Sequence, residues 1–168
     1  MPVPRDPLPH TLALVRIATG LLFVLFGQYK VFGSAFVNGF AATIERYINQ
    51  NQAVGFYKVF LTKVVLPNAE LFAYLVAWGE LLIGIALVLG LWVRLASLAG
   101  AVHMASLMLA TWYAPGANAP LWRFFAAQLE HLPLLFLFTI FIAARTSEVW
   151  SVEAAWRRRR RKAKSRQE

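Results

Sequence analysis

Four stretches of the chain are apolar at almost every position, and each is long enough to cross a lipid bilayer. A hydrocarbon core of about 30 Å takes roughly 20 helical residues to cross. The stretches span about residues 11–33, 68–90, 93–113 and 121–145. They predict an all-α integral membrane protein whose core is a bundle of four transmembrane helices.

The boundaries of the first two spans carry local signals. Prolines within residues 1–10 exclude a regular helix before the first span. Pro67 is expected to end whatever precedes the second span, and Asn68 can cap the helix that follows. Glu70 then lies in the first turn, where the helix dipole favours an anion. These signals predict a helix that starts sharply at Asn68.

The region between these spans, residues 34–66, has a different pattern. Apolar side chains recur at helical spacing opposite polar ones, which predicts one or two amphipathic helices on the membrane surface or across the end of the bundle. Neither segment is apolar enough to cross the membrane. We therefore expect an amphipathic outer loop between the first two membrane helices. The apolar positions are Phe36, Phe40, Ile44, Tyr47 and Ile48, followed by Phe56, Phe60 and Val64.

The composition also indicates a membrane protein. The chain is 59% hydrophobic and only 15% charged, whereas a soluble domain carries about 25% charged residues. The lipid bilayer is therefore its expected surrounding. The chain contains no cysteine, which excludes disulfides, thiol nucleophiles, iron–sulfur clusters and covalently attached haem.

The net charge of +9 is concentrated at the C-terminus, where eight of the 17 Lys and Arg residues lie between Arg157 and Glu168. A basic run directly after an apolar span is typical of the cytoplasmic side and attracts anionic lipid. No nucleic-acid-binding module accompanies the run, so no nucleic-acid partner is expected. We divide the chain into a membrane domain, residues 1–150, and a basic cytoplasmic tail, residues 151–168. Four spans then place both termini in the cytoplasm.

Two ionisable residues lie inside the second and third spans. An ionisable side chain at the bilayer centre costs about 2.5–3.5 kcal/mol of insertion free energy. Each such residue is therefore expected to pair with another polar group or to have a function. Glu80 shares a helix face with Ala77 and Gly84, and His103 shares one with Ala99. Small residues at this spacing are typical of helix–helix contacts in lipid. Both side chains are therefore expected to point into the bundle.

The first span carries a similar stripe. Arg16, Gly20, Gly27 and Lys30 lie on one face, with the two basic residues toward opposite ends, where both can extend to the membrane interfaces. Arg94 lies at the tight turn between the second and third spans. We assign these basic residues structural roles.

The fourth span contains an acid and an imidazole beside a proline. Glu130 and His131 precede Pro133, which cannot donate a hydrogen bond to the carbonyl of Leu129. A free acceptor therefore lies beside two ionisable groups. Arg123 lies two turns before Glu130 on nearly the same face, and we assign it a structural role as well.

Counting about 1.5 Å of rise per residue from the outer helix ends places four of these groups at comparable depth. Two interpretations are open. The groups could pair and only fix helix register, Glu80 with His103 or Arg94 and Glu130 with Arg123 or His131. Alternatively, they could transfer protons or contact a quinone head group, whose carbonyl oxygens need donors and whose reduction needs protons. The candidate proton-transfer or quinone-contact residues are Glu80, His103, Glu130 and His131.

Two intramembrane histidines could also ligate a b-type haem. Two histidines alone are a weak argument for it, and we do not predict haem. No metal site is predicted either.

The stretch GELLIGIALVLGLWVRLASLAG, residues 79–100, resembles the central signature of the DoxX family of small four-helix bacterial membrane proteins. A Gly-Glu pair, two further glycines, an Arg and a small residue fill that signature. The stretch LVRIATGLLFVLFGQYKVFG, residues 14–33, resembles the family's opening helix. The matching residues are Gly79, Glu80, Gly84, Gly90, Arg94 and Ala96, then Arg16, Gly20, Gly27 and Lys30, with Pro67 before the second helix.

This resemblance implies a function linked to quinones. The family is similar to the small membrane subunit of an archaeal thiosulfate:quinone oxidoreductase. The resemblance implies a protein of the bacterial inner membrane that associates with a quinone-linked oxidoreductase system, with other membrane-protein subunits as partners. The cofactor is left open, with quinone as one candidate. Without cysteine, any sulfur oxidation would need a partner subunit.

An alternative function is a non-catalytic accessory or scaffold subunit of a larger respiratory or photosynthetic complex. In that case the intramembrane polar residues only hold the bundle together. The sequence leaves open whether this chain is itself an enzyme.

Overall fold

The described part of the chain is helical throughout its regular structure. The computed structural model describes residues 7–116, 118–144 and 149–164. Within those ranges it contains helices and no strand. The predicted end of the fourth span at Arg145 and the last part of the basic tail, residues 165–168, lie outside them.

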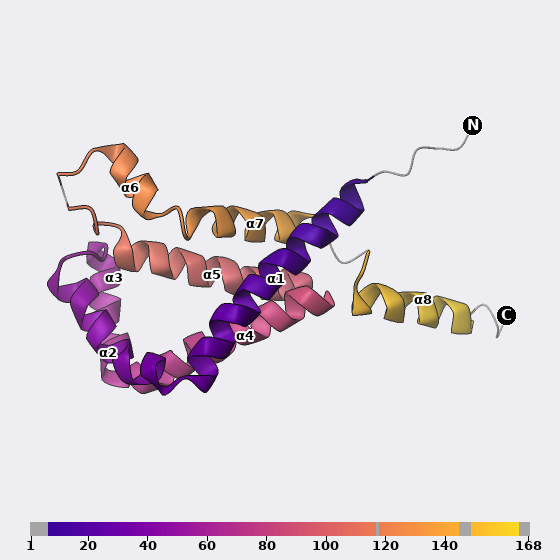
Figure 1. Cartoon of the computed structure of the whole chain (residues 1–168), viewed down its shortest axis with the longest axis horizontal. Helices are drawn as coiled ribbons and strands as arrows, with labels where there is room; N and C mark the ends of the chain where they lie inside the picture. The colour runs from indigo at the N-terminus through magenta and orange to yellow at the C-terminus, as the bar shows by residue number, and fades with distance from the viewer. Residues whose placement is uncertain (1–6, 117, 145–148, 165–168) are drawn as a thin grey trace.

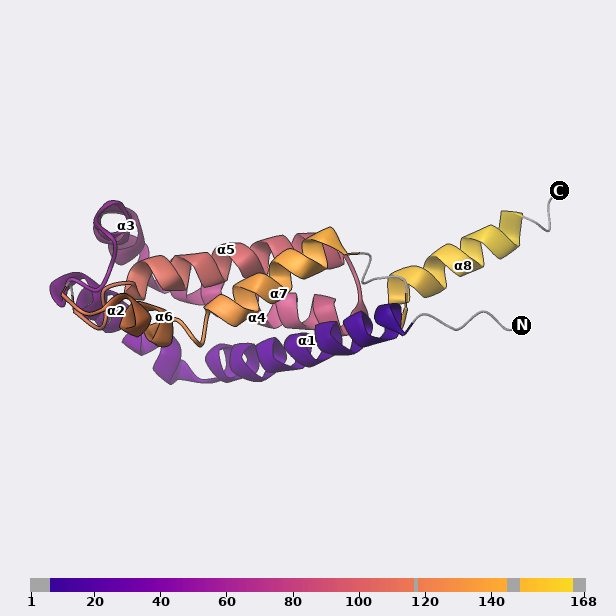
Figure 2. The same cartoon turned by 90° about the horizontal axis from the view of Figure 1, so that it is seen from above.

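Four helices pack together to form the bundle (Figures 1 and 2). They are α1 (Leu8–Phe32), α4 (Ala69–Leu89), α5 (Val93–Thr111) and α7 (Leu132–Ala143). α1 packs along α4, α5 packs along α7, and α4 contacts α5. Among the described residues, three helices are long and apolar enough to cross a membrane, or four if α7 is joined to the short helix before it. The predicted all-α membrane bundle is confirmed.

The first helix begins earlier than the sequence predicts. α1 starts at Leu8, so the expectation that prolines exclude a helix throughout residues 1–10 is wrong. Pro9 lies at the second helical position. The N–H groups of a helix's first turn have no intrahelical partner, so a proline there loses no hydrogen bond.

A layer of shorter helices crosses one end of the bundle. It consists of α2 (Ser34–Asn49), α3 (Gly55–Phe60), the π-helix η1 (Leu61–Val65) and the 3-10 helix η2 (Leu66–Asn68). Figure 2 shows α3 nearly end-on, so it runs across the direction of the bundle helices. The apolar face of α2 is turned inward, and Ile44 is buried. The predicted amphipathic outer loop is confirmed as this layer, which we call the end cap (residues 34–68).

The regular α-helix of the second span, α4, begins at Ala69, directly after Asn68 as predicted, but no break precedes it, so the expectation that Pro67 ends the preceding segment is wrong. One helical segment runs from Gly55 to Leu89, with its π and 3-10 turns next to Pro67. Pro67 has no N–H for the carbonyl four residues before it, and irregular helical turns accommodate that loss. Asn68 does not cap a helix start. Its Nδ2 instead donates to the Val64 carbonyl at 2.9 Å.

The fourth predicted span is not one continuous helix. α6 (Leu121–Ala127) and α7 meet at an angle of 69°. At the break, the Gln128 carbonyl accepts hydrogen bonds from the N–H groups of His131, at 3.0 Å, and Leu132, at 2.8 Å. Pro133 follows and has no N–H with which to continue the regular ladder. The missing hydrogen bond at Pro133 was predicted correctly, but the bend between α6 and α7 was not predicted.

The backbones of α1 and α4 are in direct contact along their small-residue stripes. A Cβ atom at Gly27 would lie 2.5 Å from the backbone nitrogen of Leu81, and one at Gly84 would lie 2.6 Å from that of Val24. Backbone atoms cannot move aside as a flexible side chain can. Only glycine therefore fits at these two positions, and the two helices are held in one register.

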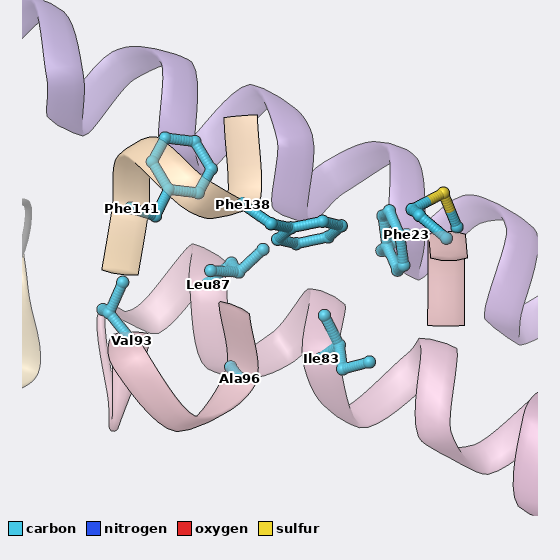
Figure 3. Close-up of a cluster of buried hydrophobic side chains, with 8 residues drawn as sticks. Phe23, Ile83, Leu87, Val93, Ala96, Phe138 and Phe141 are labelled. Atoms are coloured by element: carbon cyan, nitrogen blue, oxygen red, sulfur yellow. The ribbon is translucent and has the colours of Figure 1, made fainter. Parts of the chain in front are cut away.

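The apolar core lies where α1, α4, α5 and α7 meet (Figure 3). Phe23 of α1 and Phe138 of α7 pack edge to face, with ring centroids 5.2 Å apart. Leu87, Phe138 and Phe141 are fully buried. The Phe138 ring lies so close to Gly100 of α5 that any side chain at this position would clash with it. In lipid such packing, rather than exclusion of water, holds helices together.

The basic tail forms a further helix, α8 (Val152–Lys164). It starts at the end of the bundle where α1 begins, and it projects away from the bundle (Figures 1 and 2). The start of α1 and the basic helix therefore lie at the same end, opposite the end cap.

Candidate functional site

Three ionisable side chains from three different helices meet inside the bundle. Glu80 of α4 lies between Lys30 of α1 and His103 of α5. Its Oε1 atom is 2.5 Å from the Lys30 Nζ and 2.7 Å from the His103 Nε2. We call this group the ionic triad.

Local sequence explains why these side chains converge. Glu80 precedes Gly84 by one helical turn, and Lys30 follows Gly27 by almost one turn. The glycines bring the backbones of α1 and α4 into contact, so polar side chains on the same stripes face the partner helix. His103 lies on the third helix of the bundle, which packs against α4.

The carboxylate of the ionic triad is almost enclosed. The side chain of Glu80 is 6% exposed, compared with 14% for His103 and 23% for Lys30. A buried carboxylate is tolerated when it is paired with a charge and its oxygens accept hydrogen bonds. The Oε2 atom of Glu80 is buried and has no hydrogen-bond partner among the described residues. The triad therefore retains a free acceptor.

A cavity of about 560 Å³ lies against the ionic triad. Lys30 and His103 form part of its wall, and Glu80 contacts both from behind without lining it. This volume is within the range of about 300–1,000 Å³ that is usual for small-molecule sites. The rest of the wall is largely apolar, is rich in aromatic side chains and comes mainly from the end cap. It includes Phe36, Phe40, Tyr47, Tyr57, Phe60 and Phe72.

Backbone hydrogen bonds hold the end cap over this cavity. The N–H of Val54 donates to the Leu109 carbonyl at 2.9 Å, and the N–H of Tyr113 donates to the Gln52 carbonyl at 2.7 Å. Both bonds join the link between α2 and α3 to the end of α5. The cavity wall is therefore a fixed part of the fold.

Lys30 was predicted to have a structural role, whereas the structure places it in the ionic triad. It does not extend to the membrane interface. Its ammonium group binds Glu80 and also lies 5.0 Å from the centre of the Phe36 ring. Lys30 lies on the same stripe of α1 as Gly27, and this position is the sequence signal that could have predicted its contact with Glu80. Of the two partners open to Glu80, the structure shows His103 and not Arg94.

The candidates on the fourth span lie at the break between α6 and α7. Glu130 is exposed, and the structure does not bring it into the ionic triad. His131 is half-buried, with its Nδ1 3.3 Å from the Oε1 of Gln128. Gln128 is fully buried and donates to the Thr111 carbonyl at 3.3 Å. The part of His131 in proton transfer stays a prediction.

The other basic residues lie apart from the triad. Arg94 is exposed in the first turn of α5. Arg123 is exposed, and its guanidinium carbon lies 5.5 Å from the centre of the Trp122 ring. Arg16 does not extend into the interface, because it is fully buried and its Nη2 donates to the Trp150 carbonyl at 2.7 Å. Arg16 therefore joins α1 to the segment that leads into α8.

The chemistry of the ionic triad follows from its donors. A carboxylate only accepts hydrogen bonds, so the proton in the His103–Glu80 bond lies on Nε2, and a neutral ring then has Nδ1 free. The Lys30 ammonium has three donors and uses one on Glu80. The cavity wall thus presents a cationic donor and an imidazole, the side chain whose charge changes near neutral pH. Among the described residues, no group of three or more His, Asp and Glu side chains could hold a metal ion.

Comparison with known proteins places these features in a family. The family model described as DoxX matches residues 11–114, a stretch that includes all three residues of the ionic triad and the end cap. No curated protein and no solved structure matches the chain. Because the match covers more than half of the 168 residues, the chain belongs to the DoxX family.

Proposed function

We propose that this protein is a membrane subunit of a quinone-linked oxidoreductase system, and that the ionic triad contacts the quinone head group. One observation carries the proposal. A cationic donor, Lys30, and an imidazole, His103, both line an otherwise largely apolar cavity, with the carboxylate of Glu80 behind them. The same arrangement is the basis for expecting proton exchange at this site.

The cavity suits a quinone on chemical grounds. A quinone head group is a flat apolar ring with two carbonyl oxygens, so it needs an apolar slot and hydrogen-bond donors. The aromatic wall supplies the slot, and the ammonium of Lys30 is a charged donor for one carbonyl oxygen. The Nε2–H of His103 is bound to Glu80, so we assign the ring the role of a proton source, which reaches a carbonyl oxygen through Nδ1.

Reduction of a quinone to a quinol takes two electrons and two protons. We assign the electrons to a partner subunit that carries a redox centre. His103, on the cavity wall, passes both protons to the quinone one after the other, and Glu80 holds its ring by accepting a hydrogen bond from Nε2. His131, at the start of α7, is the group that we propose to return each proton to His103.

We further infer that the protein lies in the bacterial inner membrane with both ends in the cytoplasm. The start of α1 and the basic α8 lie at one end of the bundle, and the end cap lies at the other. Basic segments stay on the cytoplasmic side. The end cap and its cavity then lie toward the outer face of the membrane.

Quinone binding by the purified protein tests this proposal. The full chain is reconstituted in lipid nanodiscs, and its affinity for a short-chain ubiquinone or menaquinone is measured for the wild type, Lys30→Met, Glu80→Gln and His103→Ala. A hydrogen bond that involves a charged group is worth about 1.5–3 kcal/mol. We therefore expect binding that is about ten- to a hundredfold weaker for Lys30→Met.

A matched control is Glu70→Gln, which removes an exposed acid from the same helix. It should bind quinone as the wild type does. Thermal unfolding of each variant separates loss of binding from loss of fold. If folded Lys30→Met and His103→Ala variants bind quinone as tightly as Glu70→Gln does, the proposed role of the triad is wrong. A protein that binds no quinone but co-purifies in a complex would instead support the accessory-subunit alternative.

A further inference from the structure

The C-terminal helix α8 carries a dense set of cations outside the bundle. Arg158, Arg159 and Arg160 are exposed, and the helix projects beyond the bundle end (Figures 1 and 2). Consecutive residues on a helix are separated by about 100°, so these guanidinium groups point in different directions around the axis. Arg158, Arg159 and Arg160 therefore cover about 200° of the helix circumference and do not form a single stripe.

The start of α8 is fixed to the membrane bundle. The buried Arg16 of α1 donates to the Trp150 carbonyl at 2.7 Å. Ser151 then begins the helix, because its Oγ accepts a hydrogen bond from the N–H of Ala154 at 3.0 Å. The ring of Trp150 also packs edge to face with His10, with ring centroids 5.4 Å apart. The direction in which the chain leaves the bundle is thus set by contacts with α1.

Exposed apolar side chains precede the arginines at this end of the bundle. Trp150, Val152 and Trp156 are all about half exposed or more. Tryptophan is enriched at membrane–water interfaces. Arg160 lies four residues after Trp156, which is about 6 Å farther along the helix. Its guanidinium carbon also lies 3.8 Å from the centre of the Trp156 ring.

These spacings match the layers of a bilayer surface. The headgroup layer is roughly 5–7 Å thick on each side, from the difference between the hydrocarbon core and the whole bilayer. Along a helix that passes outward, Trp156 lies about 9 Å beyond Trp150. With Trp150 at the edge of the hydrocarbon, Trp156 lies at the level of the lipid headgroups together with Arg158, Arg159 and Arg160, where phosphates lie on more than one side of the helix.

We propose that α8 binds the headgroups of anionic phospholipids as it leaves the membrane, with Trp150 and Trp156 at the interface and Arg158, Arg159 and Arg160 on the phosphates. A basic helix of this kind could instead bind nucleic acid or an acidic protein surface. The lipid is favoured because the aromatic anchors and the fixed origin at Arg16 both place the arginines beside the bilayer. This inference does not rest on the proposed quinone function.

Hydrogen exchange of the full-length protein tests it. The protein is reconstituted in nanodiscs of phosphatidylcholine alone and in nanodiscs of an equal mixture of phosphatidylcholine and phosphatidylglycerol. Amide exchange across residues 152–164 is expected to be about tenfold slower in the anionic discs. Part of this protection should be lost when the salt concentration is raised, because salt screens exposed charges.

Two triple variants make the test specific. The variant with Arg158, Arg159 and Arg160 all changed to Gln should lose the protection by anionic lipid. The control with Arg46, Lys63 and Arg123 changed to Gln removes the same charge from exposed positions elsewhere, and it should keep the protection. Equal exchange of α8 in the two kinds of disc contradicts the proposal. Protection in neutral discs that appears only after RNA is added would assign the helix to nucleic acid instead.

Discussion

The ionic triad shows that a carboxylate inside the membrane bundle depends on its charged and hydrogen-bonded partners. Glu80 is tolerated there because Lys30 and His103 both bind the same carboxylate oxygen. Removing one partner from a buried ion pair leaves an uncompensated charge, which costs far more than the pair contributes in net stability. The triad should therefore respond sharply to changes at Lys30.

Replacing Lys30 with Met is predicted to destabilise the protein by about 3–5 kcal/mol, because Glu80 keeps its charge and loses its cation. Adding Glu80→Gln should recover much of this loss, since the amide oxygen still accepts from His103 and no charge is left unpaired. Unfolding of both variants in the same detergent provides the measurement. If Lys30→Met is as stable as the wild type, Lys30 is not the counter-ion of Glu80.

The sequence predicted part of this site. The small-residue faces correctly placed Glu80 and His103 inside the bundle, because helix contacts in lipid require small residues. The same rule applied to Lys30, but a long side chain near a helix end can also reach the interface. The cavity was not predicted, because its wall depends on how the end cap folds back over α5.

At the scale of helices, the contact between α1 and α4 determines where the triad forms. Gly27 and Gly84 leave no room for a Cβ atom, and the atoms in the way include backbone of the partner helix. By contrast, a Cβ atom at Gly79 of α4 would meet nothing within 4 Å. The two glycines of α4 therefore differ in their tolerance of the same substitution.

We predict that Gly84→Ala destabilises the protein by about 1–3 kcal/mol, because it forces the two helices apart. It should also weaken the contact of Lys30 with Glu80 and hence quinone binding. The control Gly79→Ala should be neutral, or stabilising by up to about 1 kcal/mol, since alanine favours the helix. Thermal unfolding of both variants is the measurement, and equal stability of the two would show that close approach of α1 and α4 is not required.

The positions of most helices followed from the apolar pattern, but two prolines were misjudged. Pro67 was expected to end the preceding segment, but the helical segment continues through it in π and 3-10 turns. Pro133 was predicted to interrupt the hydrogen bonding of the helix, but the angle between α6 and α7 was not predicted. Both outcomes depend on tertiary contacts. The bonds of Gln128 to α5, for example, fix the break between α6 and α7.

At the scale of the whole molecule, the two ends of the bundle differ in chemistry. One end carries the start of α1 and the basic helix α8, and the other carries the end cap (Figures 1 and 2), whose aromatic side chains line the cavity. Under the positive-inside rule, this asymmetry is the basis of the orientation proposed above.

Cysteine labelling in intact bacterial cells measures that orientation directly, because the natural chain has no cysteine. Asn118→Cys, before α6, is expected to react with a maleimide that cannot cross the membrane. Ala155→Cys, in α8, should react only after the membrane is permeabilised. Both positions are exposed. The reverse pattern would place the end cap in the cytoplasm.

The central claim is that a quinone head group binds in the cavity beside Lys30, Glu80 and His103. Photolabelling of the full-length protein in native membranes with an azido-quinone tests this claim most directly. The predicted result is labelling within residues 29–47, 57–76 and 103–110, the ranges that contain the cavity-lining residues, with loss of labelling when excess quinone competes. Labelling that spreads over the lipid-facing surfaces of the helices and is unaffected by competition would contradict the account.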